Sequence, residues 1–393
     1  MDFRRLSSAD LAGKTALVRV DFNVPRDDDG QVTDNTRLMA AVPTIQHLQS
    51  AGSKIVLLSH FGRPKGTPNL DFSLDFIIPA LSEALGCSVT FSPTLEKDSV
   101  DRLHAGDVLL LENTRFHAGE TTGDAGLAQA FAALGDIFVA DAFSVAHRAH
   151  ASSTGIADYL PAFAGLALER EIDHISQALE SPKKPVMAIV GGAKVSTKID
   201  LLQNLVTRLD ILAIGGGMAN TFLYAQGYNV GKSLCETDLK DTALTIMSAA
   251  EAAGCRILLP VDIVASKAFA AHAQHRVCAP EDVAPDEMIL DAGPDTVNTL
   301  CDAIDSSKTL IWNGPLGAFE LEPFDTSTVE AAKYAGERCK SGHIVAVAGG
   351  GDTVSALNHA GSADDFTFIS TAGGAFLEWM EGKALPGIEI LKK

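Results

Sequence analysis

The stretch IVAVAGGGDTVSAL, residues 344–357, passes from an apolar run through three glycines into Asp352 and Thr353, where a helix is expected to begin. Glycines at a strand-to-helix turn let the backbone approach a ligand closely, and the free N–H groups at a helix start attract phosphate. The stretch has no lysine, so it is not a Walker A loop, and it lacks the third glycine of a dinucleotide fingerprint. A phosphate held here needs positive charge from another part of the chain.

Apolar runs of the same kind recur along the chain between helix-like segments. They cover residues 15–21, 54–60, 107–113, 136–142, 185–191, 209–215, 256–262, 309–314 and 343–349. Runs that are almost continuously apolar indicate strands buried on both faces, and their alternation with helices indicates parallel sheets. An uninterrupted helical pattern over 162–180 separates the first four runs from the last five. We therefore expect an α/β protein with two parallel-sheet domains, over residues 1–165 and 166–380, joined by a connecting helix.

Composition restricts the partners of the protein. The 393 residues carry a formal net charge of −19, which argues against a broad nucleic-acid or anionic-membrane surface. No apolar run approaches the ~18 residues of a membrane span. The six cysteines form no C-x-x-C pair, and the N-terminal residues lack the apolar core of a secretory signal. We expect a cytoplasmic protein with free thiols, acting as a monomer on small molecules.

Basic side chains follow each of the first four predicted strands. In an open parallel sheet, ligands bind at the carboxyl ends of the strands, so these side chains are expected to converge. The residues there include Asp21, Phe22 and Asn23 with Arg37 further along, then His60, Phe61, Gly62 and Arg63, then Arg115, and then Arg148. Clustered arginines suit phosphate and carboxylate oxygens. The main alternative is that these arginines pair with the many acids of the chain; a metal site at His147 and His150 lacks further ligands at a fitting spacing.

Glycine pairs mark the strand ends of the second half, in the runs 190–198, 215–220, 313–320, 349–353 and 370–378. A phosphate-rich ligand laid across this edge explains the repeated pairs. Lys194 and Lys198 are spaced i, i+4 at a predicted helix start, so both ammonium groups are expected to lie on one face beside the helix N-terminus and to supply the missing charge. Asp352 is expected either to bind magnesium on the phosphates or simply to cap the helix.

Other nucleotide-binding and enzyme classes fit less well. The fragments GKT (13–15) and GYNVGKS (227–233) lack the glycine spacing of a Walker A loop, and no G-x-G-x-x-G indicates a nicotinamide dehydrogenase. A non-enzymatic nucleotide sensor stays open as an alternative; it would need no second anionic pocket, so binding of a second anionic ligand in the first half would argue against it.

Taken in order, these motifs resemble the phosphoglycerate kinase family over nearly the whole chain. The resemblance rests on RVDFNVP, HFGRPKG, LENTRFHAGE, DAFSVAHRAHAS, GGAKVSTKI, NVGKS, WNGPLGAFE, AGGGDT and the tail LPGIEIL. It implies two Rossmann-like domains, with a C-terminal segment of about residues 381–393 returning to the first. It also implies reversible phosphoryl transfer between 1,3-bisphosphoglycerate and ADP with Mg²⁺.

The resemblance also assigns roles to individual positions. It implies that Asp21, Phe22, Asn23, Arg37, His60, Phe61, Gly62, Arg63, Arg115 and Arg148 bind phosphoglycerate, and that Lys194, Lys198, Glu320, Gly350, Gly351, Asp352 and Thr353 bind the nucleotide. Arg37, Lys194 and Lys198 are the expected catalytic residues, and Asp352 the metal ligand. The chain departs from the family pattern at Ser144, Ala372 and Phe376.

Hinge closure is the expected motion, because the two substrates are assigned to different domains. A single ligand can satisfy only one domain and has limited differential affinity for a closed state. We expect small-angle scattering to show little compaction with phosphoglycerate or Mg–nucleotide alone, and a clear fall in radius of gyration with both. Full compaction with one ligand would contradict this division of binding between the domains.

Overall fold

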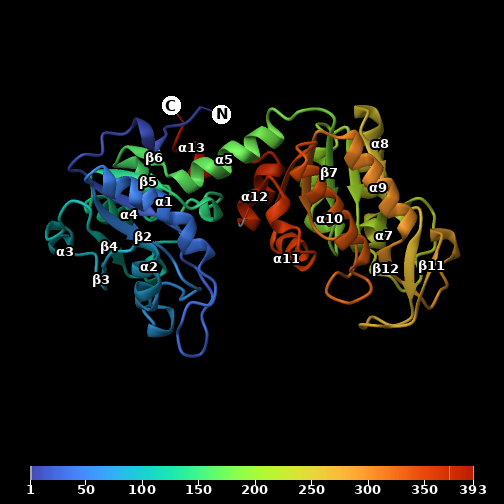
Figure 1. The fold of residues 1–393 in the computed structure, drawn as a ribbon, viewed down its shortest axis with the longest axis horizontal. Coiled ribbons are helices and arrows are strands. Elements are labelled where there is room, and N and C mark those ends of the chain that lie inside the picture. The colour runs from blue at the N-terminus through green and yellow to red at the C-terminus, as the bar shows by residue number, and fades with distance from the viewer. Residues whose placement is uncertain (1, 371, 393) are drawn as a thin grey trace. The chain divides into compact units, whose positions relative to one another are not determined.

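The contacts in the computed structural model, which describes residues 2–370 and 372–392, divide the chain into two units (Figure 1). Unit 1 contains the residues up to Asp173 together with those from Ala384 onward, and unit 2 runs from His174 to Lys383. The division falls within helix α5 (Leu166–Leu179). Two parallel-sheet units are the fold class that the apolar runs predict, and this prediction is confirmed.

Unit 1 is built on a six-stranded parallel sheet with the strand order β3-β4-β2-β1-β5-β6. Its strands are β1 (Thr15–Arg19), β2 (Lys54–Leu58), β3 (Val89–Ser92), β4 (Val108–Leu111), β5 (Ile137–Ala140) and β6 (Ala162–Ala164). Its α-helices, besides the start of α5, are α1 (Thr36–Ser50), α2 (Ile78–Leu85), α3 (Lys97–Asp101), α4 (Ala125–Ala132) and α13 (Pro386–Glu389). Leu17 of β1 pairs with Val56 and Phe138 on its two sides, and all three are fully buried. Burial on both faces explains why these strands are almost continuously apolar.

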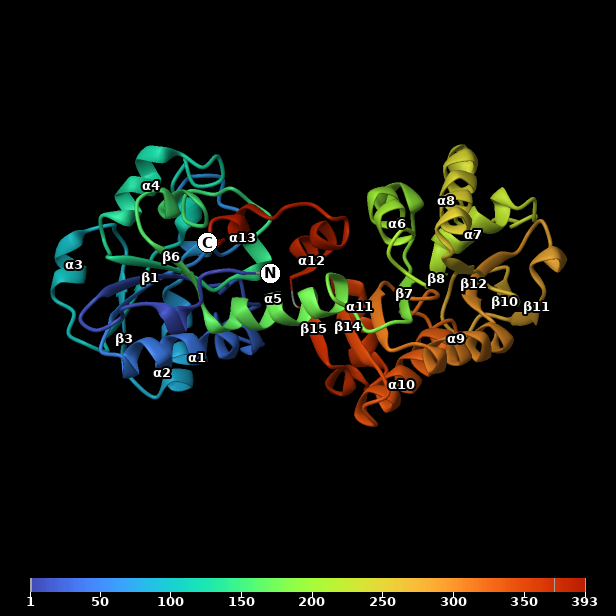
Figure 2. The same ribbon diagram turned by 90° about the horizontal axis from the view of Figure 1, so that it is seen from above.

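Unit 2 has a second six-stranded parallel sheet, in the order β15-β14-β13-β7-β8-β9. Its strands are β7 (Val186–Val190), β8 (Ile211–Ile214), β9 (Arg256–Leu258), β13 (Thr309–Asn313), β14 (Val345–Gly349) and β15 (Phe368–Ser370). Its further α-helices are α6 (Ile199–Leu205), α7 (Gly216–Ala225), α8 (Lys240–Ala253), α9 (Pro294–Ser306), α10 (Thr326–Lys340), α11 (Gly351–His359) and α12 (Gly373–Met380). Figure 2 shows α6, α7 and α8 on one face of this sheet and α9 and α10 on the other. Because the strands of this sheet are parallel, their carboxyl ends lie along one edge of the sheet, and the glycine turns lie at that edge.

A small antiparallel sheet that the sequence analysis did not predict adds to unit 2. It contains β10 (Ile263–Ser266), β11 (His275–Cys278) and β12 (Met288–Ala292), in the order β11-β10-β12. Ile263 and Ala265 of β10 pack with Val283 in a core of their own. Residues of β12 and of the loop between β10 and β11 line the cavity described below, so this sheet contributes one wall of the candidate site.

The expected helix over 162–180 begins later than predicted. Residues 162–164 form β6, which pairs in parallel with β5, and α5 starts at Leu166. The backbone N–H groups of Ala167 and Leu168 donate to the buried Asp141 Oδ1 at 2.9 and 3.3 Å. A short apolar segment fits either a strand or a helix, and here tertiary pairing with β5 decides the outcome.

The C-terminal segment returns to unit 1, as the resemblance implies. Phe3 and Lys392 form an antiparallel bridge, and the Arg4 guanidinium donates to the Ile390 carbonyl oxygen at 2.7 Å. The Gly387 N–H donates to the Ala146 carbonyl oxygen at 2.7 Å. In both views α13 lies near the N-terminus of the chain (Figures 1 and 2).

Within the described residues, no helix combines the length and the apolar character that crossing a membrane requires.

Candidate active site

The predicted basic residues of unit 1 follow the carboxyl ends of four neighbouring strands. Asp21, Phe22 and Asn23 follow β1, and His60 to Arg63 follow β2. Arg115 follows β4 and Arg148 follows β5. These strands are adjacent in the order β4-β2-β1-β5, so their following residues lie along one edge of the sheet. We call Arg37, Arg63, Arg115, Arg148 and His60 the basic cluster.

Arg37 reaches the residues after β1 from the start of α1. Its Nη1 lies 3.0 Å from Asp21 Oδ2 and donates to the Asn23 carbonyl oxygen at 3.0 Å. Asp21 Oδ2 also accepts from the Ser144 hydroxyl at 2.6 Å, so this departure from the family pattern adds a hydrogen bond that glycine cannot make. The Arg37 side chain is about one-third exposed, so part of it is accessible to a ligand.

The loop after β2 is held by amide and guanidinium contacts. Asn23 Oδ1 accepts the Gly62 N–H at 2.9 Å, and Arg115 Nη1 donates to the Gly62 carbonyl oxygen at 2.7 Å. Asn113 Nδ2 donates to the carbonyl oxygens of Phe61 and Phe72 at 2.7 and 2.8 Å. The loop thus keeps one fixed conformation beside Arg115.

Like charges stand close together in the basic cluster. Burial lowers the pKa of Arg115 to about 10, and the charges of Arg148, Arg19 and Arg63 add to that lowering. Burial lowers the pKa of His60 well below its usual value, as do the charges of Arg19, Arg115, His150 and Arg37. Such mutual repulsion is relieved by an anion, so this edge of unit 1 has the electrostatics of an anion-binding site.

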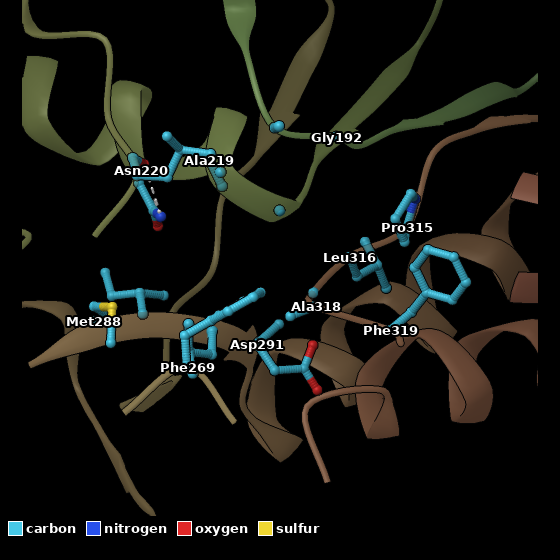
Figure 3. A pocket seen from close by; sticks show the side chains of 18 of the residues that line it. Gly192, Ala219, Asn220, Phe269, Met288, Asp291, Pro315, Leu316, Ala318 and Phe319 are labelled. Carbon is cyan, nitrogen blue, oxygen red and sulfur yellow. Dashed lines mark hydrogen bonds between the residues drawn. The ribbon is translucent and has the colours of Figure 1, made fainter. Parts of the chain in front are cut away.

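A cavity of about 490 Å³ opens in unit 2 along the glycine turns. Gly192 and Ala219 line one side of the cavity and face Met288 and Phe269 on the other, and Leu316 lies beside Pro315 at the right of the view (Figure 3). The cavity is mostly apolar, but Glu320 and Asp352 place carboxylates on its lining. An apolar cavity with polar groups at its margin suits a nucleotide, whose base is flat and whose ribose and phosphates are polar.

Lys198 is a half-buried cation beside the turn at Gly192, which lines this cavity. Its Nζ donates to the carbonyl oxygens of Gly191 and Asn313 at 2.6 and 3.2 Å and to Asn313 Oδ1 at 2.6 Å. Burial lowers the pKa of Lys198 to about 8, although the charge of Asp352 acts to raise it. The ammonium is therefore held among neutral acceptors and a nearby carboxylate, and an added phosphate would favour its charged form.

The helix-start argument for the two lysines is wrong in detail. Val195–Thr197 form a short 3₁₀ turn, and α6 begins only at Ile199, after Lys198. Lys194 and Lys198 therefore do not occupy one face of an α-helix. Lys194 is exposed and close enough to Glu236 for its charge to lower the pKa of that carboxyl.

Two of the three glycines in the opening stretch are required by the local structure. A Cβ at Gly349 would lie 2.5 Å from the Phe376 ring, so this glycine makes room for Phe376 of α12. Gly350 has φ +102°, a conformation that favours glycine, and precedes the first residue of α11. A Cβ at Gly373 would lie 3.8 Å from the Gly351 nitrogen, so the starts of α11 and α12 lie close together.

Asp352 is accessible to a ligand, whereas Thr353 supports the fold. Asp352 is the second residue of α11, exposed, and on the cavity lining; Gly350, not Asp352, caps the helix. Thr353 is buried, and its hydroxyl accepts the Gly314 N–H at 2.7 Å. The structure therefore contradicts the helix-cap alternative for Asp352.

Sequence reasoning missed several residues of both sites. Asn313, which holds Lys198, ends a predicted strand, and that position was a usable signal. Lys232 lines the cavity from the NVGKS motif, which was a usable signal, whereas Phe269 lines it from a segment that no local pattern identifies. In unit 1, Arg19 is a charged residue inside the apolar run 15–21, and this was a signal for a buried polar network.

Comparison with known proteins shows the same similarity over the whole length. The family model described as phosphoglycerate kinase matches residues 6–383. The phosphoglycerate kinase of Maricaulis maris (strain MCS10) is 63% identical over 391 residues, covering 98% of this chain and 97% of that protein. The phosphoglycerate kinase of Methylobacterium radiotolerans is 59% identical over 396 residues, covering 99% and 98%.

Solved structures give the same result for the fold. The structure of phosphoglycerate kinase from Coxiella burnetii is similar with a TM-score of 0.93 at 41% identity, covering 99% of each chain. Phosphoglycerate kinase from Pyrococcus horikoshii OT3 is similar with a TM-score of 0.79 at 28% identity, covering 99% of this chain and 98% of that one.

Proposed function

The chain belongs to the phosphoglycerate kinase family, and from that premise we propose that unit 1 binds the phosphoglycerate substrate and unit 2 binds ADP or ATP. The enzyme is a phosphotransferase with a carboxyl group as acceptor. It catalyses reversible phosphoryl transfer from 1,3-bisphosphoglycerate to ADP, giving 3-phosphoglycerate and ATP, in glycolysis and gluconeogenesis. The assignment of one substrate to each unit rests on one observation: unit 1 holds the basic cluster, and unit 2 holds a cavity large enough for a nucleotide.

The basic cluster suits phosphoglycerate because that ligand carries a phosphate and a carboxylate. Arginine forks match both groups with paired N–H donors, and the repulsion among the arginines falls when an anion arrives. The proposed binding residues are those of the resemblance: Asp21, Phe22, Asn23, Arg37, His60, Phe61, Gly62, Arg63, Arg115 and Arg148. Phe22 is fully buried, and its N–H donates to the Ser59 hydroxyl at 2.8 Å, so its side chain supports the site and its backbone shapes the turn.

The nucleotide is proposed to lie in the cavity of unit 2. Its base fits the apolar part, and Glu320 on the lining suits the ribose hydroxyls. The phosphates are assigned to Lys194, Lys198 and the turn Gly350, Gly351, Asp352 and Thr353, where the starts of α11 and α12 lie close together. Lys194 is exposed and therefore accessible to a phosphate, whereas Lys198 has to exchange its carbonyl contacts for the phosphate.

The chemistry needs positioning and charge stabilisation more than a base. In the reverse direction the attacking group is a carboxylate, which is already ionised at neutral pH, so no side chain has to remove a proton. Arg37 is proposed to stabilise the transferring phosphoryl from the phosphoglycerate side. Lys198 and Lys194 are proposed to stabilise it from the nucleotide side, because their charges compensate that which develops on its oxygens.

Magnesium is the proposed metal, and the donor chemistry of the site fits it. Mg²⁺ takes oxygen ligands and commonly uses one or two carboxylates together with substrate phosphates. Asp352 is an exposed carboxylate on the cavity lining, within electrostatic reach of Lys198. When bound, the ion neutralises phosphate charge and fixes the geometry of the phosphate chain. Asp352 is the residue that would hold it.

Replacing Asp352 by asparagine should weaken Mg–ADP binding by roughly tenfold or more, because a contact between charged groups is worth about 1.5–3 kcal/mol. Affinity for 3-phosphoglycerate should stay unchanged, since that ligand is assigned to unit 1. Isothermal titration with each ligand measures both values. Asp364→Asn, an exposed aspartate of unit 2 outside the cavity lining, is the matched control. Equal losses for both ligands would show that Asp352 supports the fold and not the metal.

The activity itself is tested by a coupled assay of ATP formation from 1,3-bisphosphoglycerate, which should depend on added Mg²⁺. Absence of turnover in a folded, ligand-binding protein would contradict the proposed catalytic residues.

The six cysteines are free thiols, and with the glycolytic reaction they support a cytoplasmic location. We propose that the enzyme acts as a monomer on its small-molecule substrates, with no nucleic-acid or membrane partner.

A further inference from the structure

A buried arginine lies beneath the basic cluster. Arg19, the last residue of β1, is 1% exposed. Its Nε donates to the Ser152 hydroxyl at 3.0 Å, and its Nη1 donates to the Val20 carbonyl oxygen. A guanidinium has five N–H donors and no acceptor, so Arg19 is the donor in every hydrogen bond that it makes.

Glu120 balances the charge of Arg19 through a serine. Glu120 is fully buried, and its carboxylate accepts both the hydroxyl and the backbone N–H of Ser152, the latter at 3.0 Å. The Ser152 hydroxyl therefore accepts from Arg19 and donates to Glu120. The Ser152 hydroxyl thus links two buried charged groups, and this contact orients the guanidinium of Arg19.

The remaining contact of Arg19 is with His60 of the basic cluster. Arg19 Nη2 lies 3.1 Å from His60 Nδ1, and His60 is only 6% exposed. Because Arg19 can only donate, His60 Nδ1 has to accept, and the proton of the ring has to sit on Nε2. An imidazolium would place two donors face to face at this contact.

The charges around His60 favour the same state. Arg19, Arg37 and Arg115 face the ring with positive charge, as does His150 when it is protonated, and burial opposes a charged ring. Together, with burial as the largest cause, they lower the pKa of His60 well below its usual value. His150 itself stays neutral at physiological pH, because burial lowers its pKa to about 4, although Glu120 lies 3.9 Å away. Among the described residues, none is recorded as a hydrogen-bond partner of His60 Nε2.

We propose that Arg19 is a positioning residue: it holds His60 as the neutral tautomer with the proton on Nε2, so that the ring presents one N–H donor to an oxygen of phosphoglycerate. The choice of ligand rests on the proposed function, whereas the tautomer rests on the contacts of Arg19. His60 then contributes the same hydrogen bond throughout the pH range in which a free imidazole titrates.

The tautomer is read directly by NMR of the whole protein with ¹⁵N-labelled histidine. His60 is assigned by the disappearance of its signals in the variant His60→Gln. We expect an unprotonated Nδ1 and a protonated Nε2, both unchanged from about pH 5.5 to about pH 8. A proton on Nδ1, or conversion to imidazolium within this range, would overturn the proposal without any variant.

The role of Arg19 is tested by the double variant Arg19→Met/Glu120→Gln, since removing Arg19 alone would leave Glu120 buried without its counter-charge. In this variant the pKa of His60 should rise toward its usual value, because the charge of Arg19 no longer lowers it, although burial, Arg115 and Arg37 still do. The dissociation constant of the variant for 3-phosphoglycerate, divided by that of the unmodified protein at each pH, should rise by about threefold to tenfold as the pH is raised through the pKa of His60 in the variant, because the cationic ring gives way to a mixture of neutral tautomers. Taking the ratio of the two dissociation constants cancels the pH dependence that comes from the ligand's own phosphate.

Two further proteins separate the possible outcomes. Arg102→Met removes an exposed arginine of unit 1 outside the basic cluster and should give a ratio of one at every pH. His60→Gln should weaken binding of 3-phosphoglycerate; unchanged affinity would contradict the proposed function of His60 and leave the tautomer result standing. A folded double variant with an unchanged His60 tautomer and a pH-independent ratio would overturn the role of Arg19. If the double variant does not fold, the NMR spectrum of the unmodified protein still decides the tautomer.

Discussion

Replacing Arg37 by alanine should lower kcat by roughly 30- to 1,000-fold, or about 2–4 kcal/mol of transition-state stabilisation. Arg37 lies in the basic cluster with one part of its guanidinium on Asp21 and Asn23, and part of its side chain is accessible to a ligand. A donor aimed at charge that develops during transfer contributes more in the transition state than in the ground state, so the loss should appear in kcat. Steady-state kinetics in both directions measure it.

The fold should survive the loss of Arg37. The ion pair with Asp21 is partly exposed, and such pairs contribute about 0–1 kcal/mol to stability. Asp21 also keeps its hydrogen bond from Ser144. The melting temperature should therefore stay close to that of the unmodified protein.

A matched control comes from Arg102, an exposed arginine of unit 1 outside the basic cluster. Arg102→Ala should leave kcat nearly unchanged. An Arg37→Ala protein with native melting behaviour and near-full turnover would contradict the catalytic role of Arg37. Arg37→Lys should recover only part of the activity, because an ammonium keeps the charge but lacks the paired donors of the guanidinium.

The central strands of both sheets were predictable because they are buried on both faces. Runs such as 15–21 and 309–314 are apolar without alternation, which is the signature of a covered parallel strand. The edge strands β3, β6 and β15 were not found, whereas the equally short edge strand β9 was, because it lies in the apolar run 256–262. In the antiparallel sheet, three of the four residues of β11 are exposed, so β11 forms no apolar run by which it could be detected.

Residues of the site were predictable where they follow a strand, and not where tertiary contacts define them. Arg37 and Arg115 could be grouped because parallel strands end at one edge. The difference between Lys194 and Lys198 could not be predicted from spacing, since it depends on a 3₁₀ turn and on Asn313, more than 100 residues further along the chain. The contact between Arg19 and His60 likewise joins the ends of two strands, and only the folded register brings them together.

Replacing Lys198 by methionine should lower kcat by about 100- to 1,000-fold, because a cation directed at the transferring phosphoryl is lost from a partly desolvated site. Met keeps much of the length of the lysine side chain, so the packing between Gly191 and Asn313 should be largely retained. Lys333→Met, which removes an exposed lysine of α10, is the control and should leave kcat unchanged. Lys194→Met measures how much the exposed Lys194 contributes to kcat under the same conditions.

The lowered pKa of Lys198 gives this prediction a second, independent readout. In the free protein, burial lowers the pKa of Lys198 from 10.5 to about 8, so near pH 8 about half of these side chains are neutral. Phosphate oxygens favour the ammonium form and raise that pKa, so ADP binding near pH 8 should take up as much as about half a proton. The uptake should vanish well below pH 8, where Lys198 is already charged. Isothermal titration in buffers of different ionisation enthalpy measures the uptake, and Lys198→Met should abolish it while Lys333→Met retains it. Equal uptake in the Lys198→Met protein would show that another group meets the phosphates, and would assign the catalytic charge elsewhere.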